Sequence, residues 1–198
     1  QILSNNFFIG STYSMHIFAF VFPKLKFSHF RFLVLFAMKF IPGNIYHVYN
    51  QGNNNQGLFM EDIHFTYFLQ LYKANLVPHC ETLAWCLMNT HFHFMIYTEN
   101  RVLEQKRQGN LLLDPITNGF RKLLSTYSHE YNIKNNRTGS LFRPKTKSIC
   151  LNDEVEFNRK FASKQDYYLN VFNYIHNNPV EAGMVTSPEE WKWSSCRF

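Results

Sequence analysis

The sequence predicts an α+β sandwich in which helices pack on one face of an antiparallel sheet. Two observations predict this fold class. Short apolar segments rich in aromatic and β-branched residues, typical of strands, alternate with longer segments whose apolar residues recur at helical spacing. The chain of 198 residues also contains 21 Phe and 11 Tyr, enough apolar surface to build the core of one domain.

The expected elements alternate along the chain, beginning with a strand. We expect strands at 45–50, 82–88 and 92–97, helices at 62–76, 116–131 and 163–177, and polar loops at 51–57 and 99–110. Asp62 is a suitable N-cap for the first helix, and Pro78 stops it. Asn89 and Thr90 form either a tight turn or a bulge between the second and third strands, or the two strands run on as one.

His91 and His93 lie two positions apart in an apolar segment expected to be a buried strand. Because side chains alternate between the faces of a strand, the two imidazoles point to the same side of the sheet. Two imidazoles one strand step apart can bind one divalent metal ion. The alternative is that they are half-buried polar residues on a sheet face.

Tyr174 and Asn178 lie four positions apart on the last expected helix, which we expect to end at Pro179. The phenol and the amide therefore project from one helix face, and an amide oxygen is an acceptable ligand for Mg²⁺ or Mn²⁺. If this helix packs beside the histidine pair, the three ligands could hold a metal ion while the Tyr174 oxygen attacks a DNA phosphate. The alternatives are a core role for Tyr174, a helix cap at Asn178, and Tyr127 as the nucleophile.

The histidine strand and the segment 174–183 together resemble the single-tyrosine HUH transposases, in particular the REP-associated tyrosine transposases. The likeness extends from Met38 to Ser195. It implies a ferredoxin-like α+β sandwich, the HUH transposase fold, which agrees with the order of elements above. It also implies Tyr174 as the catalytic nucleophile and Mg²⁺ or Mn²⁺ as the cofactor, with the metal ligands His91, His93 and Asn178.

The resemblance implies a DNA transposase that nicks single-stranded DNA near a hairpin and transfers the strand through a 5′-phosphotyrosine intermediate. Its partner would be single-stranded or hairpin DNA. The oligomeric state stays open, with a monomer favoured over a dimer. The segment after the middle helix resembles the basic loop of the family. The candidate contacts to DNA phosphates are Arg137, Arg143, Lys145 and Lys147, and the alternative is an ordinary solvated loop.

Two other functions stay open. One is a non-catalytic regulator that binds DNA or RNA hairpins, a domesticated or degraded copy. This chain has Asn89-Thr90 where the family usually has Pro-Asn before the first histidine, a departure that would weaken support of the histidines. The other is a plain metal-dependent nuclease, which would cut DNA without becoming covalently attached to it.

Residues 1–37 differ in character from the rest, with many Phe and short, broken apolar runs. We expect this leader to be non-native or disordered and a single HUH transposase-like domain to cover 38–198. The apolar runs are too short to span a bilayer, so a membrane anchor is the alternative rather than the expectation. The formal net charge of +6 is a mild bias toward polyanions. Four cysteines without a C-x-x-C motif fit a reducing, cytoplasmic setting. The resemblance implies a bacterial protein that is associated with the nucleoid when bound to DNA.

Overall fold

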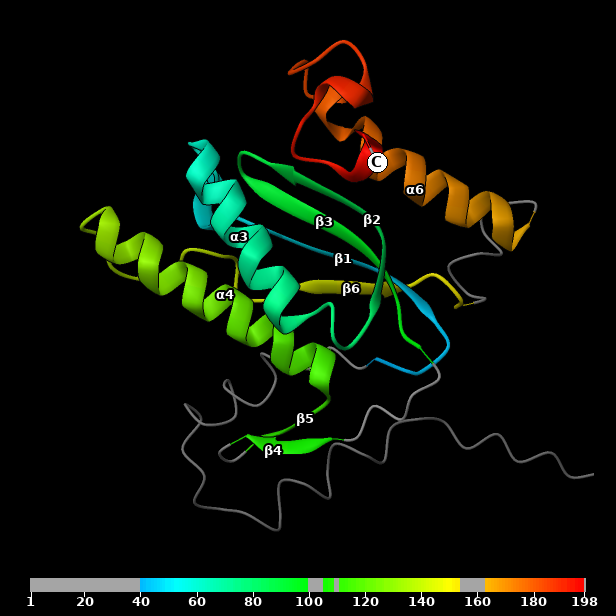
Figure 1. Ribbon diagram of the computed structural model, residues 1–198, viewed down its shortest axis with the longest axis horizontal. Helices are drawn as coiled ribbons and strands as arrows, with labels where there is room; N and C mark the ends of the chain where they lie inside the picture. Colours follow the sequence, from blue (N-terminus) through cyan, green and yellow to red (C-terminus); the bar gives the residue numbers. More distant parts are fainter. Residues whose placement is uncertain (1–39, 100–104, 109–110, 154–162, 198) are drawn as a thin grey trace, which may run out of the picture. The chain divides into compact units, whose positions relative to one another are not determined.

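The computed structural model describes residues 40–99, 105–108, 111–153 and 163–197, and the expected leader lies outside the described residues. The described chain forms a four-stranded antiparallel sheet, a separate hairpin and three α-helices (Figure 1). In order, the elements are β1 (Ile45–Gln51), α3 (Asp62–Asn75), β2 (Glu81–Met88), β3 (His91–Tyr97), β4 (Lys106–Gln108), β5 (Leu111–Leu113), α4 (Pro115–Lys134), β6 (Lys147–Cys150) and α6 (Lys164–Glu181), with 3₁₀ turns at Asn53–Asn55, Pro188–Glu190 and Ser195–Arg197. The predicted α+β class is confirmed. None of the described helices combines the length and apolar character needed to cross a bilayer.

The sheet has the strand order β2-β3-β1-β6. Strands β2 and β3 form a hairpin closed by Asn89 and Thr90, so the tight turn is the correct alternative. The carbonyl of Asn89 accepts hydrogen bonds from the backbone N–H groups of Leu58 and Phe59, at 2.7 and 3.0 Å. This turn therefore holds the polar loop that follows β1.

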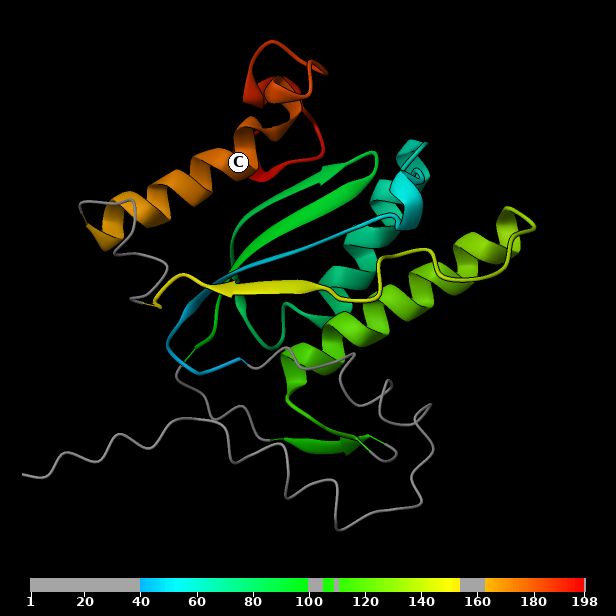
Figure 2. The ribbon, with the colours of Figure 1, turned by 180° about the vertical axis from the view of Figure 1, so that it is seen from behind.

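Strand β6 lies beside β1 at the edge of the sheet (Figure 2). The sequence pattern did not predict this strand, and the two-stranded hairpin of β4 and β5 was also missed. Both are short, and β6 contains Lys and Ser on an edge, where one side faces solvent. Pairing with β1 from Tyr46 to Tyr49, rather than an apolar pattern, holds β6 in place.

One face of the sheet carries a continuous aromatic core against α3 and α4. Phe92 and Phe94 on β3 are fully buried there. The ring of Tyr72 on α3 stacks on Phe94, with centroids 4.0 Å apart and planes 3° apart. Burial of such large rings is the main source of stability in a core of this kind.

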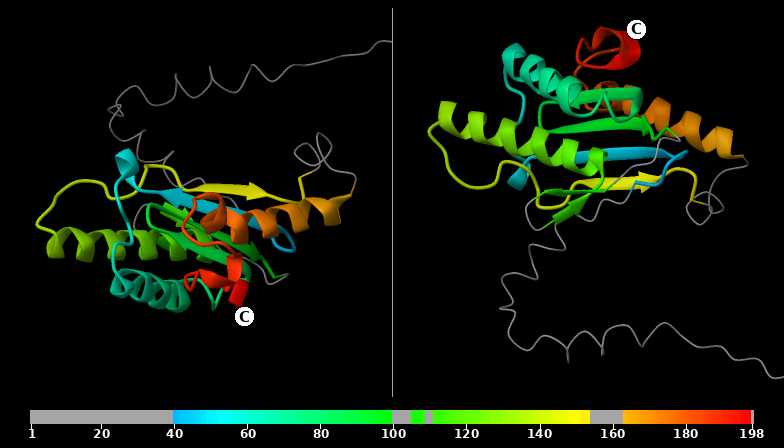
Figure 3. Two further views of the ribbon diagram at one scale, coloured as in Figure 1. Left: turned by 90° about the horizontal axis from the view of Figure 1, so that it is seen from above. Right: turned by 60° about the horizontal axis from the view of Figure 1, so that its bottom comes forward.

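The other face of the sheet is covered by α6 (Figure 3). Ile175 and Val171 of α6 pack there against Ala84 and Met95 of the hairpin. The predicted one-sided packing therefore holds for α3 and α4, whereas α6 lies on the opposite face. The reason is that Met95, which alternates with Phe92 and Phe94 on β3, forms a second, smaller apolar patch with residues of β2, and the apolar stripe of α6 packs against it.

Helix boundaries differ from prediction at two ends. Glu61 is the N-cap of α3, and Asp62 is its first residue rather than the cap. Helix α6 does not end before Pro179 but continues through it to Glu181. A proline in the last turn removes only one backbone N–H, and Gly183 follows at a φ of 68°, a conformation that glycine adopts without strain.

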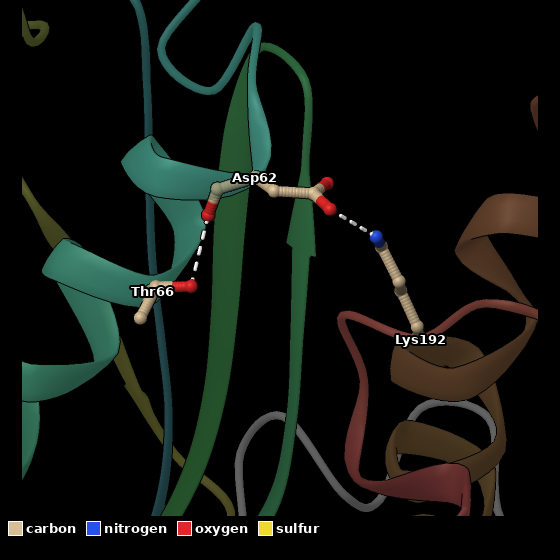
Figure 4. Close-up of polar contacts among 3 residues, drawn as sticks. All are labelled: Asp62, Thr66 and Lys192. Carbon is tan, nitrogen blue, oxygen red and sulfur yellow. Dashed lines mark hydrogen bonds and ion pairs between the residues drawn. The ribbon is translucent and has the colours of Figure 1, made fainter.

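The segment after α6 closes the outer edge of β2. Trp193 accepts a backbone hydrogen bond from Leu87 at 2.9 Å, and Trp191 Nε1 donates to the carbonyl of Leu87 at 2.9 Å. An exposed ion pair joins Lys192 to Asp62 at the start of α3 (Figure 4). Exposed pairs of this kind contribute little to stability, so the backbone pairing and the tryptophans hold this segment, and with it the end of α6.

Candidate active site between the sheet and α6

A cluster of aromatic rings lies on the face of the sheet that α6 covers. His93 on β3 pairs in register with Tyr49 on β1. His47, one strand step from Tyr49, stacks its imidazole on His93 with centroids 5.1 Å apart. The two imidazoles also share a hydrogen bond, with His47 Nε2 and His93 Nδ1 2.9 Å apart. Both histidines are buried.

Tyr174 projects from α6 onto this cluster. Its ring lies edge-on to His93 and His47, with centroid distances of 5.5 and 6.1 Å. The next residue, Ile175, is fully buried and anchors this turn of the helix. Because 42% of the Tyr174 surface is exposed, the phenol stays accessible while its ring rests on the histidines. The structure thus brings Tyr174 and the histidine strand together, and its role as nucleophile stays a prediction.

Asn178 lies one helical turn after Tyr174 and is buried. Its Nδ2 donates to the carbonyl of Tyr174 at 2.8 Å, within the helix rather than at its end, so it is not a cap. Burial lowers the pKa of His91, and a hydrogen bond with the Asn178 side chain partly raises it again. The two side chains that are expected to share a metal ion therefore lie close together.

The residue before His91 also contacts it. Thr90 Oγ1 lies 3.0 Å from His91 Nδ1. The pair Asn89-Thr90 was expected to weaken support of the histidines, yet its threonine supplies a hydroxyl that holds the His91 ring. A hydrogen bond to one ring nitrogen fixes the orientation of the other.

Burial keeps the histidines of this cluster neutral. It lowers the pKa of His47 from 6.5 to about 4. Burial also lowers the pKa of His93, and the neighbouring His47 and His91 lower it further. At pH 7 these imidazoles are therefore uncharged, the form from which a histidine binds a metal ion.

The donors that converge here fit a divalent cation. His91, His93 and Asn178 offer two ring nitrogens and one amide oxygen, a set suited to Mg²⁺ or Mn²⁺ with positions left for other ligands. His93 Nε2 is buried without a hydrogen-bond partner among the described residues, an orphaned atom that a bound cation would satisfy. In the described part of the chain, no group of three or more His, Cys, Asp or Glu side chains could hold a metal ion. The Asn178 amide as the third protein ligand stays a prediction.

Arg137, one of the four predicted DNA contacts, is half-buried. Its guanidinium donates to the side chains of Asn132 and Gln56, at 2.6 and 2.8 Å. These bonds tie the end of α4 to the loop after β1. A phosphate would have to compete with both partners, so the protein itself already occupies this guanidinium.

The other three predicted DNA contacts, Arg143, Lys145 and Lys147, are exposed. Lys147 on β6 pairs in register with Tyr49, which places it on the same face of the sheet as the histidines. When the Gln51 side-chain amide is oriented with its oxygen toward Arg143, that oxygen accepts hydrogen bonds from Arg143 Nε at 2.7 Å and Nη1 at 2.9 Å. Since Gln51 pairs with His91, this cation lies at one end of the histidine strand.

The structure separates the rival residues from the site. Tyr127 is buried in the aromatic core, and its hydroxyl donates to the carbonyl of Leu58 at 2.6 Å. Burial raises its pKa, so it has neither the access nor the acidity of a nucleophile. His176 faces away from Tyr174 and shares a 2.8 Å hydrogen bond with Ser195, a structural contact.

Sequence reasoning missed His47. The signal was available, because His47 alternates with the apolar residues Tyr46 and Val48 on β1 and must face the opposite side of that strand. The pattern could not show that this side is also the side of His93. That depends on the pairing of β1 with β3.

The sheet order and the placement of the helices define an α+β sandwich with the fold of the HUH transposases. Among solved structures, the chain is similar to a REP-associated tyrosine transposase bound to a REP hairpin, with a TM-score of 0.53 and 16% identity over 80% of each chain. At this identity the likeness shows the fold alone. A comparison with protein-family models found no match, and neither did a comparison with curated proteins.

Proposed function

We propose that this protein is a DNA transposase that nicks single-stranded DNA near a hairpin and transfers the strand through a 5′-phosphotyrosine at Tyr174. One observation carries the proposal: an exposed phenol on α6 rests against two buried imidazoles of the sheet. A phenol so placed can meet a phosphate that arrives from solvent. The fold shared with a transposase that was solved bound to a hairpin supports the same function.

In this proposal Tyr174 acts as the nucleophile. Its phenolic oxygen forms a bond to phosphorus, the bond from phosphorus to the 3′-oxygen breaks, and the phenolic proton ends on that leaving oxygen. The products are a 5′-phosphotyrosine and a free 3′-hydroxyl. The new ester conserves the energy of the phosphodiester, so a second 3′-hydroxyl can attack it and rejoin the strand without an external energy source.

His91, His93 and Asn178 would hold the Mg²⁺ or Mn²⁺ ion. A cation bound there would polarise the scissile phosphate and neutralise charge that develops in the transition state. The Asn178 amide also donates to the Tyr174 carbonyl, which fixes the turn that carries the phenol relative to His91. The buried His47 and His93 rings beneath the phenol keep water from that side.

The exposed cations would contact the DNA backbone. Lys147 and Arg143 lie along the histidine face, and Lys145 lies between them in sequence. Contacts between such side chains and phosphates position DNA without reading its sequence, and their strength falls as salt rises. The proposed partner is single-stranded DNA that carries a hairpin.

The test is a covalent adduct assay with hairpin oligonucleotides taken from inverted repeats in the DNA that flanks the gene. Wild-type protein with Mn²⁺ should form an adduct that survives denaturing electrophoresis and maps by mass spectrometry to Tyr174. Tyr174→Phe should form none while still binding the hairpin. The matched control is Tyr168→Phe, on the same helix and half-buried, which should form adduct as wild type does. An adduct from Tyr174→Phe would show that the nucleophile is another residue.

A second candidate is a non-catalytic regulator that binds hairpins. It is favoured by the donor set, because the third ligand is a neutral amide and no carboxylate joins the described histidines. Such a protein would bind the hairpin equally well with a chelator present and would leave no adduct. Cleavage without adduct would instead indicate a plain metal-dependent nuclease.

A further inference from the structure

The proposed chemistry gives the buried His47 no contact with the cation or with the phosphate. Its Nε2 lies 2.9 Å from His93 Nδ1, and the two rings stack 25° from parallel. Since that nitrogen is engaged with His93, it is not free to bind the cation itself. The contact of His47 with the site therefore runs through His93.

The two nitrogens of His93 are in opposite situations. Nδ1 faces His47, whereas Nε2 is buried and has no hydrogen-bond partner among the described residues. A neutral imidazole has one N–H and one lone pair. If Nδ1 carries the hydrogen, it donates to His47 Nε2, and the lone pair remains on His93 Nε2. The other tautomer would bury an N–H at Nε2 without an acceptor, an arrangement that folded proteins rarely tolerate.

We propose that His47 is a positioning residue, which accepts a hydrogen bond from His93 Nδ1 and so presents the lone pair of His93 Nε2 to a divalent cation. Metal-binding histidines commonly donate their second N–H to a carboxylate or a carbonyl. Here the acceptor is a second imidazole, held by β1 at the correct register. The inference rests on the proposed function only in taking the cation to be the one used by Tyr174.

The first experiment measures Mn²⁺ binding by electron paramagnetic resonance, with the full chain and without DNA. His47→Leu removes the acceptor at similar volume and should weaken Mn²⁺ affinity roughly 10- to 100-fold, the range for loss of such a partner. His47→Gln offers an amide oxygen near the same place and should restore most of the affinity. The matched control is Tyr49→Phe, which keeps a ring against His93 and should bind as wild type does. Circular dichroism checks that each variant is folded.

The second experiment reads the tautomer directly, from long-range ¹H–¹⁵N spectra of the metal-free wild type. His93 should be protonated on Nδ1 and His47 unprotonated on Nε2. A His93 protonated on Nε2 overturns the inference, and so does a folded His47→Leu that binds Mn²⁺ with wild-type affinity. If His47→Leu does not fold, the wild-type spectrum and the His47→Gln titration decide the matter.

These outcomes are separate from those of the adduct assay. Mn²⁺ binding that depends on His47, with no adduct formed by wild type, would keep the inference and reject the transposase. Adduct formation with a His93 tautomer opposite to that expected would keep the transposase and reject the inference.

Discussion

Replacing Asn178 tests whether this residue is a metal ligand or only stabilises α6. Its Nδ2 makes one hydrogen bond, to the carbonyl of Tyr174 at 2.8 Å, and loss of one such bond costs about 1 kcal/mol. Asn178→Ala should therefore lower the free energy of unfolding by about 1–2 kcal/mol, because its contact with His91 is lost as well. It should also weaken Mn²⁺ binding by at least about tenfold, because the proposed oxygen ligand is lost. Asn178→Asp keeps an oxygen ligand and should recover the affinity.

Stability is measured by urea denaturation and affinity by Mn²⁺ titration, both without DNA. The matched control is Asn177→Ala, its half-buried neighbour, which should leave Mn²⁺ affinity unchanged. The reasoning is refuted if Asn178→Ala binds Mn²⁺ as wild type does, whatever stability it loses. Asn178 would then serve the helix alone.

Three further predictions concern pH, DNA and the core. Burial raises the pKa of the Cys80 thiol from 9.0 to about 12, so the folded state keeps a proton that the unfolded chain releases above pH 9. In reducing buffer, the free energy of unfolding of wild type relative to that of Cys80→Ala should fall by roughly 1.4 kcal/mol per pH unit between pH 9 and 12. If the two proteins show the same dependence of unfolding free energy on pH, this prediction is wrong. Lys147→Gln should reduce the slope of log affinity for the hairpin against log salt concentration by about 0.9. The control Lys122→Gln, exposed on α4, should leave the slope unchanged. A Lys147→Gln slope equal to that of wild type would show that Lys147 does not contact the DNA. Phe94→Ala empties a fully buried position and should cost about 3–5 kcal/mol in urea denaturation. Phe172→Ala, partly exposed on α6, should cost less than about 1 kcal/mol. If the two substitutions lower the free energy of unfolding equally, Phe94 is not part of the core.

The candidate site was largely predictable because its residues are paired by local geometry. Strand alternation places His91 and His93 on one face, and the helical repeat places Tyr174 and Asn178 on another. Neither the strand alternation nor the helical repeat determines how far apart the two pairs lie in space. Their meeting follows from a small apolar patch around Met95 that receives α6.

The sequence pattern did not reveal contacts between segments that are distant along the chain. The one-sided packing expected of the helices holds for α3 and α4 but not for α6, because both faces of the β2–β3 hairpin carry apolar residues and each face needs its own cover. The hydrogen bond of His47 with His93 requires the register of β1 on β3, and the engagement of Arg137 by Gln56 joins residues 81 apart in sequence. Local periodicity determines which way a side chain points within its own strand or helix. The burial of complementary apolar surfaces determines what it meets, and that free energy belongs to the assembled sheet and helices rather than to any single segment.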